Sequence, residues 1–260
     1  MIKALFFDID GTLVSFATHR IPESAVRALR QARQNGLRIF IATGRPRQLI
    51  DNIGEVSDLI DGYVTVNGAY CFVGDEVVAF SPIPACEARA IRQAAGRMGA
   101  ACLSVGCGGL RMDNASEELL GSLRQLLNIG DIREVASFDE LARQGIVQMT
   151  VFVTEEQEPE LLAGAPTAIS SRWYPTFTDV TSDGADKGRG IARMAEYFGI
   201  RIEETMAFGD GGNDVAMLRA AGIGVAMGNA GVDVQSAADY VTDSVDRDGV
   251  EKALLHFGLI

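Results

Sequence analysis

A strand–helix–strand unit near the start of the chain constrains its fold more than any other feature. Residues 2–7 form an apolar run that is typical of a buried strand, and residues 38–42 form a second one. Between them lies a helical pattern that begins near Pro22 and ends at Asn35-Gly36, a common helix C-terminus. Because the connections are tight, the pattern predicts two parallel strands joined by a crossover helix.

The same alternation returns at the other end of the chain. Helices are predicted at residues 187–198 and 213–221, and strands at 205–209 and 222–226. We therefore expect an α/β fold in which residues 1–81 and 182–260 form one doubly wound parallel sheet, the catalytic core. Residues 82–181 are expected to form a smaller inserted α+β domain, the cap.

The predicted cap begins at a connector that contains Pro82 and Pro84. Its expected helices lie near residues 85–98, 117–126 and 155–162, and its expected strands near 101–105, 110–113, 146–153, 168–174 and 177–180. Just before the connector, Asn67-Gly68 separates two strand-like segments, and this dipeptide favours a type I′ hairpin turn. We interpret Asn67 as part of the turn rather than as a ligand.

Composition excludes several classes of protein. The chain has 260 residues, of which 47% are hydrophobic, and a formal net charge of −12 with no basic run, which argues against nucleic-acid binding. No apolar stretch is long enough to span a bilayer, and the acids at positions 8 and 10 interrupt the N-terminal run, unlike a signal peptide. The four cysteines form no C-x-x-C pair, which favours a reducing, cytoplasmic environment. Nothing demands an oligomer, so we expect a monomer.

Polar residues follow the predicted strands of the core at both ends of the chain. Asp8 and Asp10 follow the first strand, Thr43-Gly44-Arg45 the second, and Asp210–Asp214 the strand at 205–209, while Lys187 begins a helix. The carboxyl ends of parallel strands face one crevice, where ligands bind in open α/β sheets. Alone, Thr43 could cap a helix and Asp210-Gly211 could be a turn. Together, the four segments indicate one site.

These four segments resemble a known motif set. D-x-D-G-T after a strand, T-G-R after a strand, D-K-G at a helix start and G-D-G-G-N-D are similar to the motifs of the haloacid dehalogenase (HAD) superfamily. Their order and spacing resemble its Cof-type branch of sugar-phosphate phosphatases with a type IIB cap. The resemblance implies an HAD-like Rossmannoid core and a phosphatase that acts on small phosphorylated metabolites such as hexose phosphates.

The residue chemistry supports an aspartyl-phosphate route. A carboxylate nucleophile divides the hydrolysis of a phosphate ester into two steps, and Asp8 is the candidate at the matching position. Asp10 would protonate the departing alcohol and later deprotonate water. By the resemblance, Mg²⁺ is held by the Asp8 carboxylate, the Asp10 backbone carbonyl and Asp210. Asp214 would hold a metal-bound water or orient Lys187.

The remaining candidates would bind the phosphate or the substrate. Lys187 supplies a positive charge to the phosphoryl oxygens, and Thr43, Gly44 and Asn213 supply hydrogen-bond donors. Arg45 lies close enough in sequence to Thr43 to reach the substrate, and it could equally pair with a surface acid.

Three other classes of protein share part of this chemistry. A phosphotransferase or phosphomutase of the same superfamily stays open, because water and a sugar hydroxyl can both attack an aspartyl phosphate. A dehalogenase has no alkoxide to protonate, so Asp10 argues against it. A receiver-type phosphoacceptor module is a shorter single domain and lacks a general acid two residues after the nucleophile.

Overall fold

The chain folds into two compact units. The computed structural model describes residues 1–117, 119–121 and 137–260. Met1–Ala79 and Asp186–Ile260 form the core unit, and Phe80–Ala185 form the cap unit. The predicted α/β fold with an inserted α+β domain is confirmed, with a largely parallel sheet in the core and a separate antiparallel sheet in the cap.

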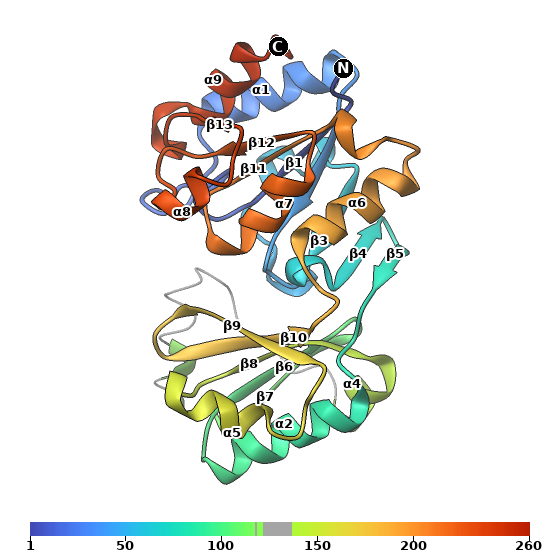
Figure 1. Ribbon diagram of the computed structural model, residues 1–260, viewed down its shortest axis with the longest axis vertical. Helices are drawn as coiled ribbons and strands as arrows, with labels where there is room; N and C mark the ends of the chain where they lie inside the picture. Colours follow the sequence, from blue (N-terminus) through green and yellow to red (C-terminus); the bar gives the residue numbers. More distant parts are fainter. Residues whose placement is uncertain (118, 122–136) are drawn as a thin grey trace. The chain divides into compact units, whose positions relative to one another are not determined.

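The core sheet has eight strands in the order β13-β12-β11-β1-β2-β3-β4-β5 (Figure 1). Their bounds are β1 Ala4–Phe7, β2 Arg38–Ala42, β3 Gly62–Thr65, β4 Tyr70–Val73, β5 Glu76–Phe80, β11 Thr205–Gly209, β12 Ile223–Ala226 and β13 Tyr240–Val241. The strands from β13 to β3 are parallel, and β4 pairs with β3 in the antiparallel sense. The first strand therefore lies in the middle of the sheet: Ala4 pairs with Thr205 on one side and with Arg38 on the other.

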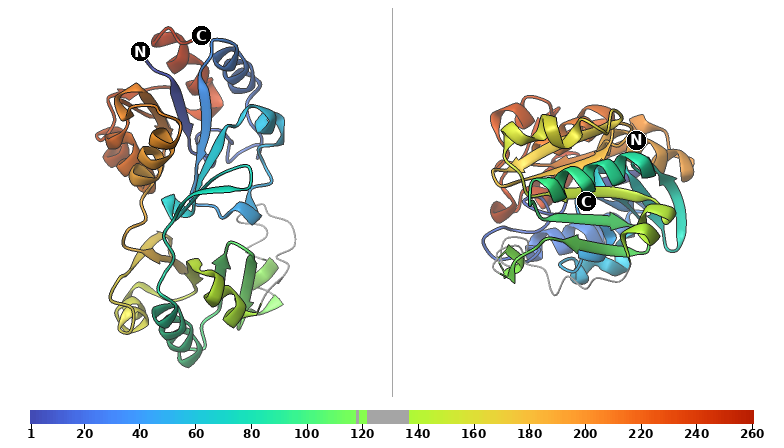
Figure 2. Two further views of the ribbon diagram at one scale, coloured as in Figure 1. Left: turned by 90° about the vertical axis from the view of Figure 1, so that its right-hand side faces the viewer. Right: turned by 90° about the horizontal axis from the view of Figure 1, so that it is seen from below.

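Strand β1 is apolar throughout because both faces of the sheet are covered. Leu5 and Phe7 lie in one apolar cluster, and Ala4 and Phe6 lie in another on the opposite face. Helices α1 (Glu23–Gln34) and α9 (Gly249–His256) contribute to the first cluster. Helices α6 (Lys187–Tyr197) and α7 (Val215–Ala220) contribute to the second. They are the orange helices that lie to one side of the sheet in Figure 2 (left). Such double coverage gives a continuous hydrophobic strand rather than an alternating one.

The helix signals in the sequence match the structure at two important points. Helix α1 follows Pro22 and ends at Asn35, and Gly36 adopts φ 86°, a left-handed conformation that glycine accepts readily. Helix α6 begins directly after Asp186, whose side chain accepts a hydrogen bond from the backbone N–H of Arg189. This cap fixes the helix start at Lys187.

The turn predicted at Asn67-Gly68 is present between β3 and β4. Asn67 has φ 51° and ψ 36°, Gly68 has φ 90°, and the N–H of Ala69 donates to the carbonyl of Val66 at 3.0 Å. These values are those of a type I′ turn. Val66 also has a positive φ, of 52°, which the sequence did not predict for a β-branched residue.

The cap unit contains a five-stranded antiparallel sheet in the order β7-β6-β8-β10-β9. Its strands are β6 Cys102–Gly106, β7 Gly109–Asp113, β8 Ile146–Val151, β9 Ala168–Tyr174 and β10 Phe177–Ser182. Helices α2 (Ala85–Arg97), α4 (Phe138–Gln144) and α5 (Glu158–Leu162) supply apolar side chains to one buried cluster with this sheet.

Three short helices were not predicted: α4 in the cap, α8 (Val232–Gln235) and α9. The helix predicted near residues 117–126 lies largely outside the described residues. Within the described part of the chain, no helix combines the length and the hydropathy that crossing a membrane requires.

Candidate functional site

The loops that follow three neighbouring strands of the core sheet meet at one edge. In the sheet, β1 lies between β11 and β2, and all three run in the same direction. Their carboxyl ends at Phe7, Ala42 and Gly209 therefore lie side by side. The segments that follow these ends are the ones in which the sequence analysis placed its candidates.

A buried lysine joins two of the acids. The ammonium of Lys187 is 2.7 Å from Oδ1 of Asp8 and 2.5 Å from Oδ1 of Asp214. The side chains of Lys187 and Asp214 are fully buried, and only a tenth of the Asp8 side chain is exposed. An ammonium without partners would not be stable there, so both carboxylates are needed to hold it.

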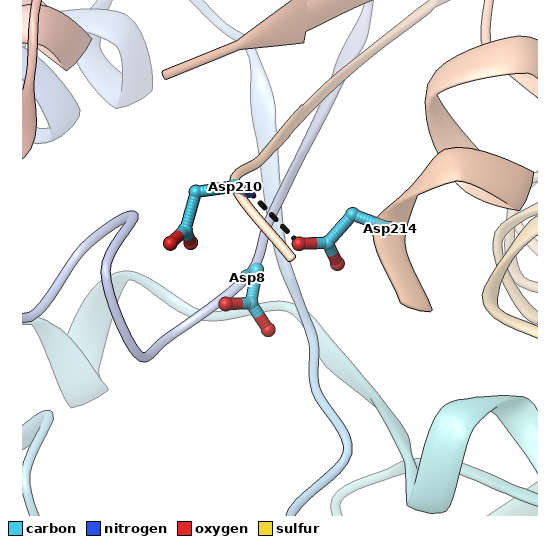
Figure 3. Close-up of side chains that lie close together, drawn as sticks. All are labelled: Asp8, Asp210 and Asp214. Carbon is cyan, nitrogen blue, oxygen red and sulfur yellow. Dashed lines mark hydrogen bonds between the residues drawn. The ribbon is translucent and has the colours of Figure 1, made fainter. Parts of the chain in front are cut away.

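Three carboxylates converge around this lysine, which leaves an excess of negative charge. One carboxylate oxygen from each of Asp8, Asp210 and Asp214 lies within 4.8 Å of the other two. Figure 3 shows the three side chains close together. Three carboxylates and one ammonium have a formal charge of −2 in a site that is mostly buried. A small cation with oxygen ligands would neutralise it. The residues therefore fit a divalent metal ion.

Burial and the neighbouring charges also shift the pKa values of Asp8, Asp210 and Lys187. Burial raises the pKa of Asp8 well above its usual value, and Lys187 only partly offsets this effect. Burial also raises the pKa of Asp210 to about 6, although the Thr12 hydroxyl donates to it. Burial lowers the pKa of Lys187, but Asp214 and Asp8 outweigh it and keep that pKa above the usual value. The lysine is thus charged, while the acids need a further positive charge or a proton.

Asp214 is held as a structural partner more than as an open ligand. Its Oδ2 accepts hydrogen bonds from the backbone N–H groups of Asp210 and Gly211, at 2.9 and 2.8 Å. Its Oδ1 binds Lys187. These contacts fit the predicted role of Asp214 in orienting Lys187.

Asp210 is positioned by two side chains that the sequence analysis did not select. The Thr12 hydroxyl donates to Oδ1 of Asp210 at 2.8 Å. The side-chain amide of Asn229 donates to Oδ2 at 3.2 Å and to the Gly11 carbonyl at 2.9 Å. Thr12 belongs to the D-x-D-G-T motif, so the sequence could have identified it as a site residue. Asn229 lies outside all four motifs.

Asp10 is not one of the three converging acids, and it pairs with Arg45. The guanidinium Nε is 2.6 Å from Oδ2 of Asp10, and Nη2 is 2.9 Å from Oδ1. Arg45 also donates to the carbonyl of Leu49. The side chain of Asp10 is 30% exposed, and that of Arg45 is 12% exposed. The sequence left Arg45 open between the substrate and a surface acid; in the structure it pairs with Asp10, the candidate general acid and base.

The proposed phosphate-binding residues surround the same edge. Thr43 is buried and its hydroxyl accepts a hydrogen bond from the backbone N–H of Arg45 at 3.0 Å. It does not cap a helix, because the next helical turn, Arg47–Leu49, begins after Pro46. The side-chain amide of Asn213 donates to Oδ1 of Asn67 at 2.9 Å. Asn67, interpreted from the sequence only as a turn residue, thus lies at the site.

Known proteins resemble this chain over nearly its whole length. A family model described as haloacid dehalogenase-like hydrolase matches residues 5–254. A solved structure described as the HAD subclass IIB sugar phosphatase BT4131 is 51% identical, with a TM-score of 0.90, and the match covers 99% of this chain and 100% of that one. YkrA of Bacillus subtilis is 32% identical over 99% of this chain and 98% of that protein. A 5-amino-6-(5-phospho-D-ribitylamino)uracil phosphatase of Bacillus subtilis, YcsE, is 28% identical over 99% of this chain and 96% of that protein.

Proposed function

The chain belongs to the haloacid dehalogenase-like hydrolases, and from this membership we propose that it is a Mg²⁺-dependent phosphatase of small sugar phosphates. The predicted assignment to the phosphatases of this superfamily is confirmed by the matches. The observation that carries the proposal is the buried arrangement of Asp8, Lys187 and Asp214 beside Asp210. With a divalent cation to offset the excess negative charge, this group suits a reaction that brings a phosphate dianion to a carboxylate.

Asp8 is proposed as the nucleophile. Its carboxylate oxygen forms a bond to phosphorus while the bond between phosphorus and the alcohol oxygen breaks, which yields an aspartyl phosphate. Water then attacks phosphorus, releases inorganic phosphate and regenerates the carboxylate. Lys187 holds Oδ1 of Asp8 at 2.7 Å, so the side chain cannot rotate freely before the attack.

Asp10 is proposed as the general acid and base. It would donate its proton to the departing alkoxide in the first step and take a proton from water in the second. In the structure, Arg45 donates two hydrogen bonds to the Asp10 carboxyl group and so fixes its orientation.

Magnesium is proposed to be held by Asp8, Asp210 and the backbone carbonyl of Asp10. An oxygen-only donor set is the kind that Mg²⁺ prefers. When bound, the ion offsets the charge of the carboxylates and of the incoming phosphate. Lys187, Thr43, Gly44 and Asn213 would bind the remaining phosphoryl oxygens, the lysine as a point charge and the others as hydrogen-bond donors.

The proposed substrate class is that of phosphorylated sugars, hexose phosphates above all. Its support is the structure that is 51% identical over the whole chain and is described as a sugar phosphatase. Selectivity among such substrates would come from the cap unit, since the core residues above address only the phosphoryl group. The partner proposed is a small phosphate ester, and the protein is proposed to act as a cytoplasmic monomer.

A turnover assay tests the proposal. We expect repeated release of phosphate from p-nitrophenyl phosphate and from a panel of phosphorylated hexoses and pentoses, with loss of activity in EDTA and recovery with Mg²⁺. Asp8→Asn should retain the fold by circular dichroism and lose nearly all turnover. A single stoichiometric phosphorylation, or sugar-phosphate isomerisation without phosphate release, would contradict the phosphatase. Full activity of Asp8→Asn would exclude Asp8 as the nucleophile.

A further inference from the structure

The turn between β3 and β4 has a backbone that a chain rarely adopts. Val66, Asn67 and Gly68 follow one another with φ values of 52°, 51° and 90°. Glycine accepts such values freely and asparagine tolerates them, but a β-branched residue in this region is a genuine outlier. Val66 is also 99% buried, with 1% of its surface exposed. Strain of this kind persists only where the surrounding structure imposes it, and it is concentrated at functional sites.

Backbone contacts tie this turn to two other segments of the site. The N–H of Asn67 donates to the Thr43 carbonyl at 3.1 Å, and the N–H of Val66 donates to the Arg45 carbonyl at 3.3 Å. At Gly68, a Cβ atom would collide with the carbonyl of Asp186, the residue directly before Lys187. The turn therefore packs against the T-G-R loop and against the start of α6.

The side chain of Asn67 reaches a third segment. Its Oδ1 accepts the hydrogen bond from the Asn213 amide at 2.9 Å. Both amides lie over Gly44, where a Cβ atom would be 3.3 Å from Oδ1 of Asn67 and 3.4 Å from Nδ2 of Asn213. Asn213 is itself exposed, so its amide has little else to fix its orientation. A carboxamide nitrogen has two N–H groups, and the bond to Asn67 leaves the second one available.

We propose that Asn67 is a positioning residue, which orients the Asn213 amide and shapes the surface over Gly44 for the phosphate group. The proposal rests on the proposed function, because it assumes that Asn213 and Gly44 bind phosphate. The left-handed backbone is needed to aim the Asn67 side chain across the site. A purely conformational role is the competing explanation, since asparagine is simply a common residue in this type of turn.

Asn67→Gly separates the two explanations. Glycine suits a left-handed position at least as well as asparagine, so the turn is retained while the amide is removed. If Asn67 serves only the turn, this variant should match the natural protein in all respects. If Asn67 orients Asn213, the variant should bind phosphate more weakly without any loss of stability.

The matched control is Asn114→Gly in the cap unit. Asn114 also has a left-handed backbone, with φ 58°, and its amide donates to the Ala100 carbonyl at 3.3 Å. The same substitution in the same backbone conformation thus removes an amide that the proposal does not use. Asn114→Gly should change neither phosphate binding nor turnover.

The measurements are the affinity for inorganic phosphate in the presence of Mg²⁺, by isothermal titration calorimetry, together with kcat, KM and the melting temperature. For Asn67→Gly, we expect phosphate affinity to fall and KM to rise about tenfold, the effect of one hydrogen bond to a charged group. We expect kcat to change much less and the melting temperature to stay the same. Asn213→Ala should show a similar loss, and the double variant should be no worse than Asn213→Ala alone.

Two results would overturn the proposal: phosphate affinity in Asn67→Gly equal to that of the natural protein, or losses in Asn67→Gly and Asn213→Ala that multiply in the double variant. Failure of the proposed function is a different observation. In that case the natural protein itself would release no phosphate and bind none with Mg²⁺, and the positioning role would fall with it.

Discussion

Replacing Lys187 with methionine tests how the buried charges are balanced. Methionine keeps a long unbranched side chain and removes the ammonium from its two contacts, with Oδ1 of Asp8 and Oδ1 of Asp214. The variant leaves three acids close together with no internal cation. We expect it to lose both stability and activity.

The size of the loss follows from the geometry. At these separations, each ammonium–carboxylate attraction is about 6 kcal/mol with an effective dielectric constant of about 20. Removal of the ammonium also abolishes its own desolvation cost, which is several kcal/mol in a fully buried position. We therefore expect a net loss of about 3–5 kcal/mol in the free energy of unfolding, the range for breaking a buried ion pair.

The loss should depend on pH. Lys187 lowers the pKa of Asp8, which burial has raised, so its removal raises that pKa further. A group whose pKa is higher in the folded state contributes stability below its unfolded value, near pH 4, and that contribution is lost as the pH rises. The deficit relative to the natural protein should thus be smaller near pH 4 than near pH 7, and it should shrink when Mg²⁺ is added.

Urea unfolding of both proteins across this pH range, with and without Mg²⁺, measures the deficit. Lys252→Met is the control, because Lys252 pairs with Asp243 at 2.6 Å while half of each side chain is exposed. That surface pair should contribute less than about 1 kcal/mol. Equal losses for the two variants, or a Lys187→Met deficit that does not change with pH, would refute the reasoning.

Two further predictions concern the acids. Asp10→Asn should slow turnover of alkyl phosphates more than that of p-nitrophenyl phosphate, because only the poor leaving group needs a proton; equal slowing in steady-state assays would contradict the acid–base role. The pKa of Asp210 is raised to about 6 in the folded protein. Protonated Asp210 therefore stabilises the metal-free fold at low pH, and this stabilisation is lost as the pH rises. Magnesium must displace that proton, so it should raise the melting temperature more at about pH 7.5 than at about pH 5, and equal shifts would count against Asp210 as a ligand.

The core of the fold could be predicted because its signals are local and mutually consistent. Strand β1 is apolar on both faces, and α1 carries both a starting proline and a terminating Asn-Gly. By contrast, α8 spans only Val232–Gln235, a single turn that is too short to show a helical period. Helices α4 and α9, of seven and eight residues, are also short and were not predicted.

The site was predicted as a set of residues, but not as a set of contacts. The motifs identified the acids and Lys187, because carboxylates after parallel strands and a lysine at a helix start carry the chemistry themselves. The partner of Arg45 stayed open between substrate and acid, since spacing alone cannot show which way a long side chain turns. Asn67 was read only as a turn, because its bond to Asn213 joins positions 146 residues apart.

The central place of β1 in the core sheet has a consequence for how the protein is made. Its neighbour β11 pairs with it from Ala4 to Thr205, a separation of 201 residues. At ribosomal rates of about 5–20 residues per second, the second partner emerges roughly 10–40 s after the first strand. Until then one edge of this apolar strand is unpaired, and Asp8 has neither Lys187 nor Asp210 beside it. We therefore expect the candidate site to assemble only after β11 and the loop that follows it have been translated, and the nascent chain to be most exposed to aggregation before that point.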